Sequence, residues 1–168
     1  EQAPNVFAGS PEVAYYHQNA YGDEPLPEVA DPPEPLGAAQ RLLNAYVAML
    51  DHKQPQVRRT LATLAEPGAL PAVVHCASGQ DRAGRITALV LGIAGVPAET
   101  IAEDYALSAR FLVRRSYEDE PGLEDSGYTW EDYQRESCPP DVMLKLLQHL
   151  DERYGGVEAY VRSAGLST

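Results

Sequence analysis

The sequence contains few cysteines, few basic residues and no long hydrophobic run. Two cysteines among 168 residues exclude a disulfide framework and a cysteine-rich zinc module. No apolar run approaches the roughly 20 residues that a membrane-spanning helix needs, so we expect no membrane association. Thirteen Lys and Arg against 25 Asp and Glu give a net charge of −12. This charge argues against nucleic acid or an anionic membrane as a partner held by bulk electrostatics.

The length and the overall composition fit one globular domain. A chain of 168 residues has the usual size of a single domain, and its 44% hydrophobic and 23% charged residues lie near globular averages. We therefore expect residues 1–168 to form one domain that buries a core without disulfides or metals. No signal-peptide pattern follows Glu1, so we expect a cytoplasmic protein, or a secreted one from which a leader has been removed.

Proline and acidic residues are concentrated in two stretches. Residues 1–36 contain seven of the 14 prolines, seven acids and no Lys or Arg. This predicts a mostly irregular segment, because proline fixes φ and lacks an amide donor. One short strand is expected at Val13–His17, where β-favouring residues gather. The second stretch, Glu118–Glu136, carries eight acids and predicts a loop with a helical turn near Trp130–Tyr133.

Helical spacing of apolar residues dominates the rest of the chain. The helix after the polar loop described below is apolar nearly all round, which predicts a central position for it. Pro139 and Pro140 are expected to start the longest C-terminal helix, and Gly155 is expected to end it. The predicted helices cover residues 39–50, 57–64, 83–94, 97–112, 140–154 and 157–161.

The most informative segment joins an apolar strand to an apolar helix through a short polar loop. Ala69–Cys76 has the length and the β-branched content of a buried strand, and the loop runs from Cys76 to Arg82 with Gly79 at a tight turn. A loop of this length that wraps back on itself aims successive backbone N–H groups at one point. It thereby makes an anion site, strengthened by the helix N-terminus. The positive potential of these amides and of the helix N-terminus favours a Cys76 thiolate, and Arg82 can hold two phosphoryl oxygens.

Two interpretations of Cys76 follow from this pattern. A lone cysteine at a strand end is most often an inert buried residue. Together with Gly79, Arg82 and the strand–loop–helix context, however, a phosphate-binding loop with a nucleophilic cysteine is the favoured interpretation. The residues expected to bind the phosphoryl group are Ala77, Ser78, Gly79, Gln80, Asp81 and Arg82.

Three segments resemble the cysteine-dependent protein tyrosine phosphatases. Residues 75–84, HCASGQDRAG, are similar to the family's His-Cys-x5-Arg signature, and more closely to the HCxAGKDRTG loop of its bacterial and fungal branch. Residues 104–108 (DYALS) and 154–160 (YGGVEAY) are similar to two further segments of that branch. The resemblance covers about residues 70–168, and the loop is its most specific part.

The resemblance implies a fold and a reaction. The fold is a tyrosine-phosphatase-like α/β domain, with a central, mostly parallel sheet flanked by helices and a helix-rich C-terminal half. The reaction is hydrolysis of phosphotyrosine through a phosphocysteine intermediate, with no metal and no cofactor, on a phosphoprotein or a small phosphomonoester. A phosphoinositide phosphatase and a weakly active, phosphate-binding pseudophosphatase are the alternatives.

The chain departs from the family pattern in three respects. Gln80 stands where the branch has Lys, which removes a cation suited to phosphoinositide head groups. Ala83 stands where the branch has Thr, whose hydroxyl helps the phosphoenzyme break down; Ser78 is the nearest hydroxyl that could replace it. The family's N-terminal strands are not recognisable, so they either lie in sequence outside this chain or are hidden in residues 1–36; we favour the first, because the composition of 1–36 suits strands poorly.

The general acid has several candidates. Asp81 matches the acid of the resembling branch, and its competing role is to cap the helix that follows the loop. Other tyrosine phosphatases use an Asp on an upstream mobile loop, and Asp23, Asp31 and Asp51 are the candidates for that arrangement.

Two further side chains flank the loop. His75 is expected to fix the Cys76 backbone by a hydrogen bond and to add positive potential; the alternative is a neutral histidine in the core. Arg85 either adds positive potential near the phosphate or lies on the helix surface.

The remaining candidates are structural or conditional. Arg114 and Arg115 fit a solvated charge pair better than a substrate contact. Asp104 and Tyr105 are expected to hold their helix against the loop. Cys138, next to two prolines, is a candidate disulfide partner of the loop cysteine under oxidation.

Overall fold

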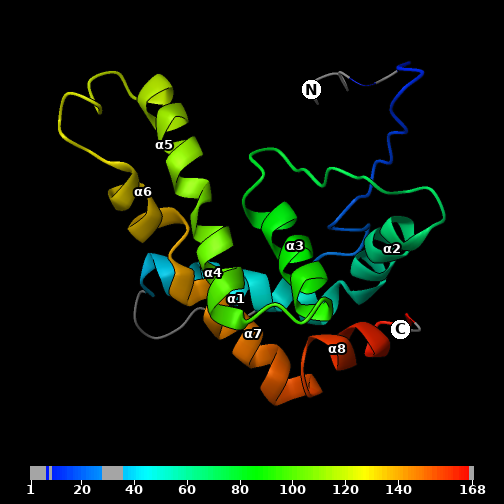
Figure 1. The fold of residues 1–168 in the computed structure, drawn as a ribbon. Helices are drawn as coiled ribbons and strands as arrows, with labels where there is room; N and C mark the ends of the chain where they lie inside the picture. The colour runs from blue at the N-terminus through cyan, green and yellow to red at the C-terminus, as the bar shows by residue number, and fades with distance from the viewer. Residues whose placement is uncertain (1–6, 8, 28–35, 167–168) are drawn as a thin grey trace.

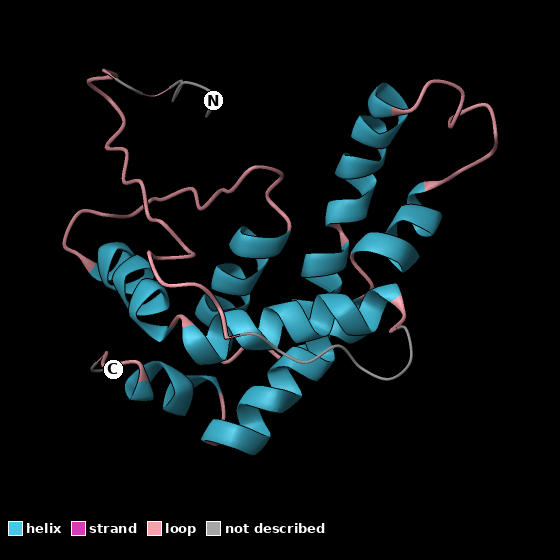
Figure 2. Ribbon diagram, turned by 180° about the vertical axis from the view of Figure 1, so that it is seen from behind, coloured by secondary structure: helices cyan, strands magenta, loops and turns pink. Residues whose placement is uncertain are grey.

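The computed structural model describes residues 7, 9–27 and 36–166, and within them it contains eight α-helices (Figure 1). The reverse view shows helices joined only by loops (Figure 2). In none of the described ranges is a helix both long and apolar enough to cross a membrane. The helices are α1 (Ala38–His52), α2 (Gln54–Ala65), α3 (Asp81–Ile93), α4 (Ala98–Ala106), α5 (Ser108–Asp119), α6 (Trp130–Ser137), α7 (Pro140–Tyr154) and α8 (Val157–Ser163).

Helix α7 is the centre of the hydrophobic core. It contacts α1, α4 and α8, and its buried face follows the helical spacing of the sequence. Burying each of its large aliphatic side chains contributes about 1.5–3 kcal/mol. The buried residues of α7 are Val142, Met143, Leu146, Leu147 and Leu150.

The ends of α6 and α7 follow local sequence signals. Pro139 is the N-cap of α7 and Pro140 is its first residue, and Gly155 ends the helix at φ 85°, as predicted, because glycine adopts positive φ without strain. Thr129 and Asp132 form a reciprocal capping box at the start of α6. This cap supports a helix of eight residues, where the sequence predicted a single turn.

Helices α5 and α6 pack against each other and extend away from the rest of the molecule (Figure 1). The predicted helix over 97–112 is two helices, since α4 ends at Ala106 and α5 begins at Ser108. Phe111, on α5, is 78% exposed.

The two predicted strands are wrong for this structure. Both Val13–His17 and Ala69–Cys76 are extended loop, and no strand occurs among the described residues, so the predicted central sheet is not found there. Val73 and Leu70 are 89% and 71% exposed, although an apolar run of this kind predicted burial. An extended segment becomes a strand only by pairing with a neighbour, and the described residues provide none.

The helix that follows the loop, α3, is less central than predicted. Its inner face buries Ala88 and Leu89, but Val90 and Ile93 are 41% and 38% exposed. It packs closely where it meets α4, because a Cβ at Gly84 would lie only 3.0 Å from Cδ2 of Tyr105. This close approach fixes the N-terminal end of α3, and with it the end of the loop.

Candidate active site

The loop between Cys76 and α3 is the structural focus of the site. It leaves the extended segment at Cys76, turns at Gly79 with φ 77°, and enters α3 at Asp81. The positive φ at Gly79 is the turn that the sequence predicted, and glycine is the residue that adopts it most readily. The loop therefore returns on itself directly before a helix N-terminus.

The Cys76 thiol lies where loop amides converge. Burial by itself raises the pKa of Cys76, but four backbone N–H groups donate toward the sulfur and outweigh it, so the net pKa is lowered. Hydrogen bonds from amides stabilise the thiolate over the thiol. The four amides belong to Ala83, Ser78, Gly79 and Arg82.

The Arg82 side chain lies over an aromatic ring of the N-terminal segment. Its guanidinium carbon is 5.6 Å from the centroid of the Tyr21 ring. No ion pair to Arg82 occurs within the part of the chain that the structure describes. Its charge is therefore not neutralised by a described carboxylate.

Asp81 is held by a tyrosine from α1 rather than acting as a helix cap. Oδ1 of Asp81 accepts a hydrogen bond from the Tyr46 hydroxyl at 2.5 Å, and that hydroxyl lies 2.9 Å from the hydroxyl of Tyr105. The N-cap position of α3 is Gln80, whose side chain makes no capping bond. The capping role considered for Asp81 is thus not observed.

Arg85 is buried, which corrects the interpretation of it as a surface residue. It is only 6% exposed, and its guanidinium carbon lies 4.6 Å from the centroid of the Tyr46 ring. Burial lowers the pKa of Arg85, whereas attraction to Tyr46 and Asp81, and more weakly to Cys76, acts in the opposite direction. A guanidinium stays protonated under such conditions, so Arg85 places a fixed positive charge in electrostatic range of both Cys76 and Asp81.

Gln80 turns inward and connects the loop to α6. It is 5% exposed; its Nε2 donates to the Ser137 carbonyl at 2.7 Å, and its Oε1 accepts from the Tyr133 hydroxyl at 3.2 Å. Gln80 therefore contributes to the loop through its backbone and through this side-chain link.

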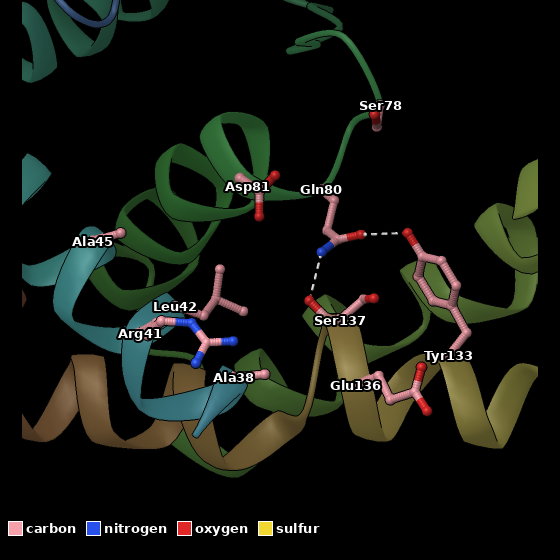
Figure 3. A pocket seen from close by; sticks show the side chains of 10 residues that line it. All are labelled: Ala38, Arg41, Leu42, Ala45, Ser78, Gln80, Asp81, Tyr133, Glu136 and Ser137. Carbon is pink, nitrogen blue, oxygen red and sulfur yellow. Dashed lines mark hydrogen bonds between the residues drawn. The ribbon is translucent and has the colours of Figure 1, made fainter. Parts of the chain in front are cut away.

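A pocket of about 510 Å³ opens beside the loop, between α1 and α6; we call it the α1–α6 pocket. Figure 3 shows Gln80 between Tyr133 and Ser137, with Asp81 at the start of α3. The pocket combines an apolar floor from α1 with one basic and two acidic side chains. It is lined by Ala38, Arg41, Leu42, Ala45, Ser78, Gln80, Asp81, Tyr133, Glu136 and Ser137.

His75 is an exposed residue, so its interpretation as a core histidine is wrong. Its Nδ1 lies 3.3 Å from the carbonyl oxygen of Cys76, which is the backbone contact that the sequence predicted. Its ring also lies 6.1 Å from that of Tyr15.

The alternative acids differ in their surroundings. Asp51 is engaged by α7, where its Oδ1 accepts from the Tyr154 hydroxyl at 2.8 Å and lies 3.0 Å from Nε2 of His149. Asp23 is exposed in the N-terminal segment, and Asp31 lies outside the described residues. Of the three candidates within the described residues, Asp81 is the one that lines the pocket beside the loop.

Further residues that the sequence analysis did not assign to catalysis lie on α4 and α5. Arg114 and Arg115 pair with Glu118 and Asp119 on exposed turns of α5, in agreement with the solvated-pair interpretation. Tyr105 packs against α3, as predicted. Asp104 is exposed.

Cys138 is a core residue. It is fully buried at the end of α6 and, like Cys76, is a free thiol. In the described ranges, no three His, Cys, Asp or Glu side chains gather in a way that could hold a metal ion.

Tyr46 is the site residue that the sequence did not identify. It lies on the buried face of α1, where it is 1% exposed. No local pattern indicates that its hydroxyl meets a carboxylate 35 positions further along the chain.

Comparison with known proteins identifies the class to which this loop and its helices belong. The whole chain, residues 1–168, matches the model of the tyrosine phosphatase family, and the chain belongs to that family. The resemblance stated from the three sequence segments is thereby confirmed.

Two curated relatives show how much of the family this chain covers. It is 29% identical over 175 residues to a tyrosine-protein phosphatase of Nostoc commune, an alignment that covers 99% of this chain and 58% of the relative. It is 28% identical over 109 residues to the triple specificity protein phosphatase PtpB of Mycobacterium tuberculosis, covering 58% of this chain and 40% of the relative. The chain thus spans about half the length of the curated relatives it matches. No solved structure matches it significantly.

Alkylation of Cys76 is expected to begin at lower pH than that of an ordinary cysteine. Iodoacetamide reacts with the thiolate, and the pKa of Cys76 is lowered by the loop amides, against the effect of burial. The pH at which Cys76 reacts at half its maximal rate should therefore lie below that of an ordinary cysteine. Peptide mass spectrometry between about pH 5 and pH 10 measures this directly.

Cys138 provides an internal control for the alkylation experiment. It is fully buried, and burial raises its pKa to about 11, so it should remain unmodified at neutral pH while the protein is folded. Equal pH dependence of the two cysteines would contradict the assignment of a thiolate-stabilising loop.

Proposed function

We propose that the chain carries the active site of a phosphomonoester hydrolase that acts on phosphotyrosine. The observation that carries the proposal is the convergence of four backbone amides on Cys76, which lowers the pKa of its thiol despite burial. Amides that stabilise a thiolate can equally bind the phosphoryl oxygens of a substrate, since both are anions. Family membership supports the same conclusion.

The proposed reaction has two steps. In the first, Cys76 Sγ attacks phosphorus, the bond from phosphorus to the leaving oxygen breaks, and Asp81 gives its proton to that oxygen. In the second, Asp81 takes a proton from water, the water oxygen bonds to phosphorus, and the S–P bond breaks to release phosphate and the thiolate. Arg82 and the loop amides stabilise the charge on the phosphoryl oxygens in both steps.

The α1–α6 pocket is suited to the organic part of the substrate. Both Asp81 and Ser78 line it, so a group seated there would bring its ester oxygen beside the proposed acid. Its lining includes Leu42 and Tyr133, which offer apolar and aromatic surface to a phenol ring.

Gln80 favours phosphotyrosine over phosphoinositides as the substrate class. Its side chain is buried and bonded to the Ser137 carbonyl and the Tyr133 hydroxyl, so its polar atoms are engaged within the protein and it offers no charge to a phosphoinositide head group. With no lysine at that position and a net charge of −12, a polyanionic membrane lipid is the less suitable substrate.

Phosphate release from p-nitrophenyl phosphate tests the proposed activity. We expect turnover in the presence of EDTA, and competitive inhibition by vanadate, which resembles the pentacoordinate transition state of phosphoryl transfer. A phosphotyrosine peptide and a soluble phosphoinositide compared at equal concentration then separate the substrate classes. Phosphate binding without turnover on any of the three substrates would leave the chain a binding module and overturn the proposal.

Ala83→Thr is expected to accelerate breakdown of the phosphoenzyme. A threonine hydroxyl would add a donor to the departing Cys76 sulfur, which now has the Ala83 backbone amide. A hydrogen bond to a charged group contributes about 1.5–3 kcal/mol, or roughly ten- to a hundredfold in rate. Rapid-quench kinetics should show a burst of p-nitrophenol in the wild type that shrinks in the variant.

Ser78→Ala is the matched control for Ala83→Thr. It removes the nearest natural hydroxyl of the loop and should leave the burst unchanged if Ser78 takes no part in that step. A wild type without a burst, whose turnover does not respond to threonine at position 83, would show that phosphoenzyme breakdown does not limit the rate.

A further inference from the structure

Three side chains from three different helices form a hydrogen-bonded series that ends at the proposed acid. The hydroxyl of Tyr105 on α4 lies 2.9 Å from the hydroxyl of Tyr46 on α1. The Tyr46 hydroxyl in turn lies 2.5 Å from Oδ1 of Asp81 on α3. Tyr46 and Tyr105 are 1% and 4% exposed, so the series is shielded from water on the tyrosine side.

The series has one direction when Asp81 is ionised. A carboxylate only accepts hydrogen bonds, so the single proton of the Tyr46 hydroxyl goes to Asp81, and Tyr105 donates to the oxygen of Tyr46. Burial, and then the neighbouring Tyr105 and Asp81, raise the pKa of Tyr46 far above its ordinary value. Tyr46 therefore keeps its proton and stays a donor throughout the working pH range.

The Tyr46 ring is fixed in place from two sides. The Arg85 guanidinium lies over one face, 4.6 Å from the ring centroid. The Tyr105 ring meets it edge-on at 6.2 Å and 83°. A buried ring held in this way presents its hydroxyl at one position, and the partner carboxylate is restricted accordingly.

We propose that Tyr46 is a positioning residue that orients the Asp81 carboxyl group toward the leaving oxygen of the substrate. The proposal rests on the proposed phosphatase function, in which Asp81 is the general acid. Tyr46 holds Oδ1, and none of the hydrogen bonds among the described residues engages Oδ2. Oδ2 is thus the oxygen that delivers the proton to the leaving group and later takes one from water, while the proton of Tyr46 stays on its own oxygen.

Other titratable side chains from four helices lie near Asp81. Arg41 of α1 and Glu136 of α6 line the same pocket. Tyr46 of α1, Arg85 of α3, Tyr105 of α4, Tyr133 of α6 and Cys138 after α6 interact with Asp81 electrostatically.

Tyr46→Phe tests the proposal through the leaving-group dependence of kcat. The variant removes the hydrogen bond that holds Oδ1 of Asp81, so Oδ2 is no longer held toward the leaving oxygen. The kcat for a phosphotyrosine peptide should fall by roughly tenfold, with a smaller loss for p-nitrophenyl phosphate, whose leaving group has less need of a proton.

Tyr160→Phe is the matched control. Tyr160 is another fully buried tyrosine, and its hydroxyl donates to the Leu50 carbonyl at 2.8 Å, so its loss costs a buried hydrogen bond without touching Asp81. Thermal melting and circular dichroism report any loss of folding in both variants. The ratio of kcat for the phosphotyrosine peptide to kcat for p-nitrophenyl phosphate should not change in Tyr160→Phe.

A double-mutant cycle and a conservative substitution complete the test. If Tyr46 acts through Asp81, then Tyr46→Phe should have almost no further effect on kcat in an Asp81→Asn background. Site-specific 3-fluorotyrosine at position 46 keeps both the packing and the donated hydrogen bond, so kcat for the peptide should stay near the wild-type value, in contrast to phenylalanine.

The possible results separate this proposal from the one on which it rests. An active wild type whose kcat for the phosphotyrosine peptide is unchanged by Tyr46→Phe overturns the positioning role and leaves the phosphatase function intact. The positioning role is also overturned if Tyr46→Phe lowers kcat by the same factor in the Asp81→Asn background as in the wild type. A wild type without phosphatase activity overturns both.

Discussion

Cys76→Ser is expected to lower kcat by at least about four powers of ten, with phosphate binding retained. The serine hydroxyl stays protonated at neutral pH, whereas the pKa of Cys76 is lowered by the surrounding amides in spite of burial, so only cysteine offers an anionic nucleophile. The four amides and Arg82 are unchanged in the variant. Steady-state assays give the activity, and calorimetric titration with inorganic phosphate gives the binding.

Cys138→Ser is the matched control for this loss. Cys138 is the other free cysteine, and its sulfur lies 4.0 Å from the Ala106 carbonyl, an acceptor that a serine hydroxyl can also use. This variant should keep kcat within about a factor of two while it loses some stability. Residual activity above about 1% in Cys76→Ser would show that the nucleophile is a different group.

The helical part of the fold is predictable because its signals lie within short windows of sequence. Apolar residues three and four positions apart define α7, and Pro140 and Gly155 mark its ends within one turn. The exception inside this region is the break at Leu107. At the junction of α4 and α5, Leu107 keeps a helical backbone, with φ −59° and ψ −21°. Neither a proline nor a glycine stands there, so the sequence contains no signal for the boundary.

The two strand predictions were wrong because a strand forms only by pairing with another segment, which can lie far away in the sequence. Ala69–Cys76 has the composition of a buried strand, yet it is an extended loop here with Val73 89% exposed. Its burial and hydrogen bonding depend on partners elsewhere in the chain, and apolar composition in one segment carries no information about them.

The features of the candidate site also differ in whether local sequence or helix packing determines them. Cys76, Gly79 and Arg82 lie within seven residues, so the geometry of one turn and one helix start was enough to predict the loop. The environment of Asp81 depends on Tyr46, which arrives from another helix, and the inward turn of Gln80 depends on Tyr133 and α6. Which hydroxyl meets which acceptor is decided by helix packing, and only the structure provides that.

Asp81→Asn is expected to separate substrates by their leaving group. A departing tyrosine oxygen, with a pKa near about 10, needs a proton in the transition state, and an asparagine amide cannot supply it. We expect kcat for a phosphotyrosine peptide to fall by about a hundredfold to a thousandfold. For an aryl phosphate with a strongly acidic phenol the loss should be less than about tenfold.

Position 81 also allows the chemical and the structural role to be told apart. The side-chain amide of the Asp81→Asn variant can still accept a hydrogen bond from Tyr46 through its oxygen, so the contact at 2.5 Å need not be lost. Asp51→Asn is the matched control, because it changes a carboxylate held by Tyr154 and His149 of α7 and should reduce stability without any leaving-group dependence.

If Asp81→Asn slowed both substrates equally, Asp81 would be a structural residue and the acid would have to be sought at Asp23 or Asp31. A leaving-group dependence confined to Asp81 would identify the carboxylate at the start of α3 as the proton donor.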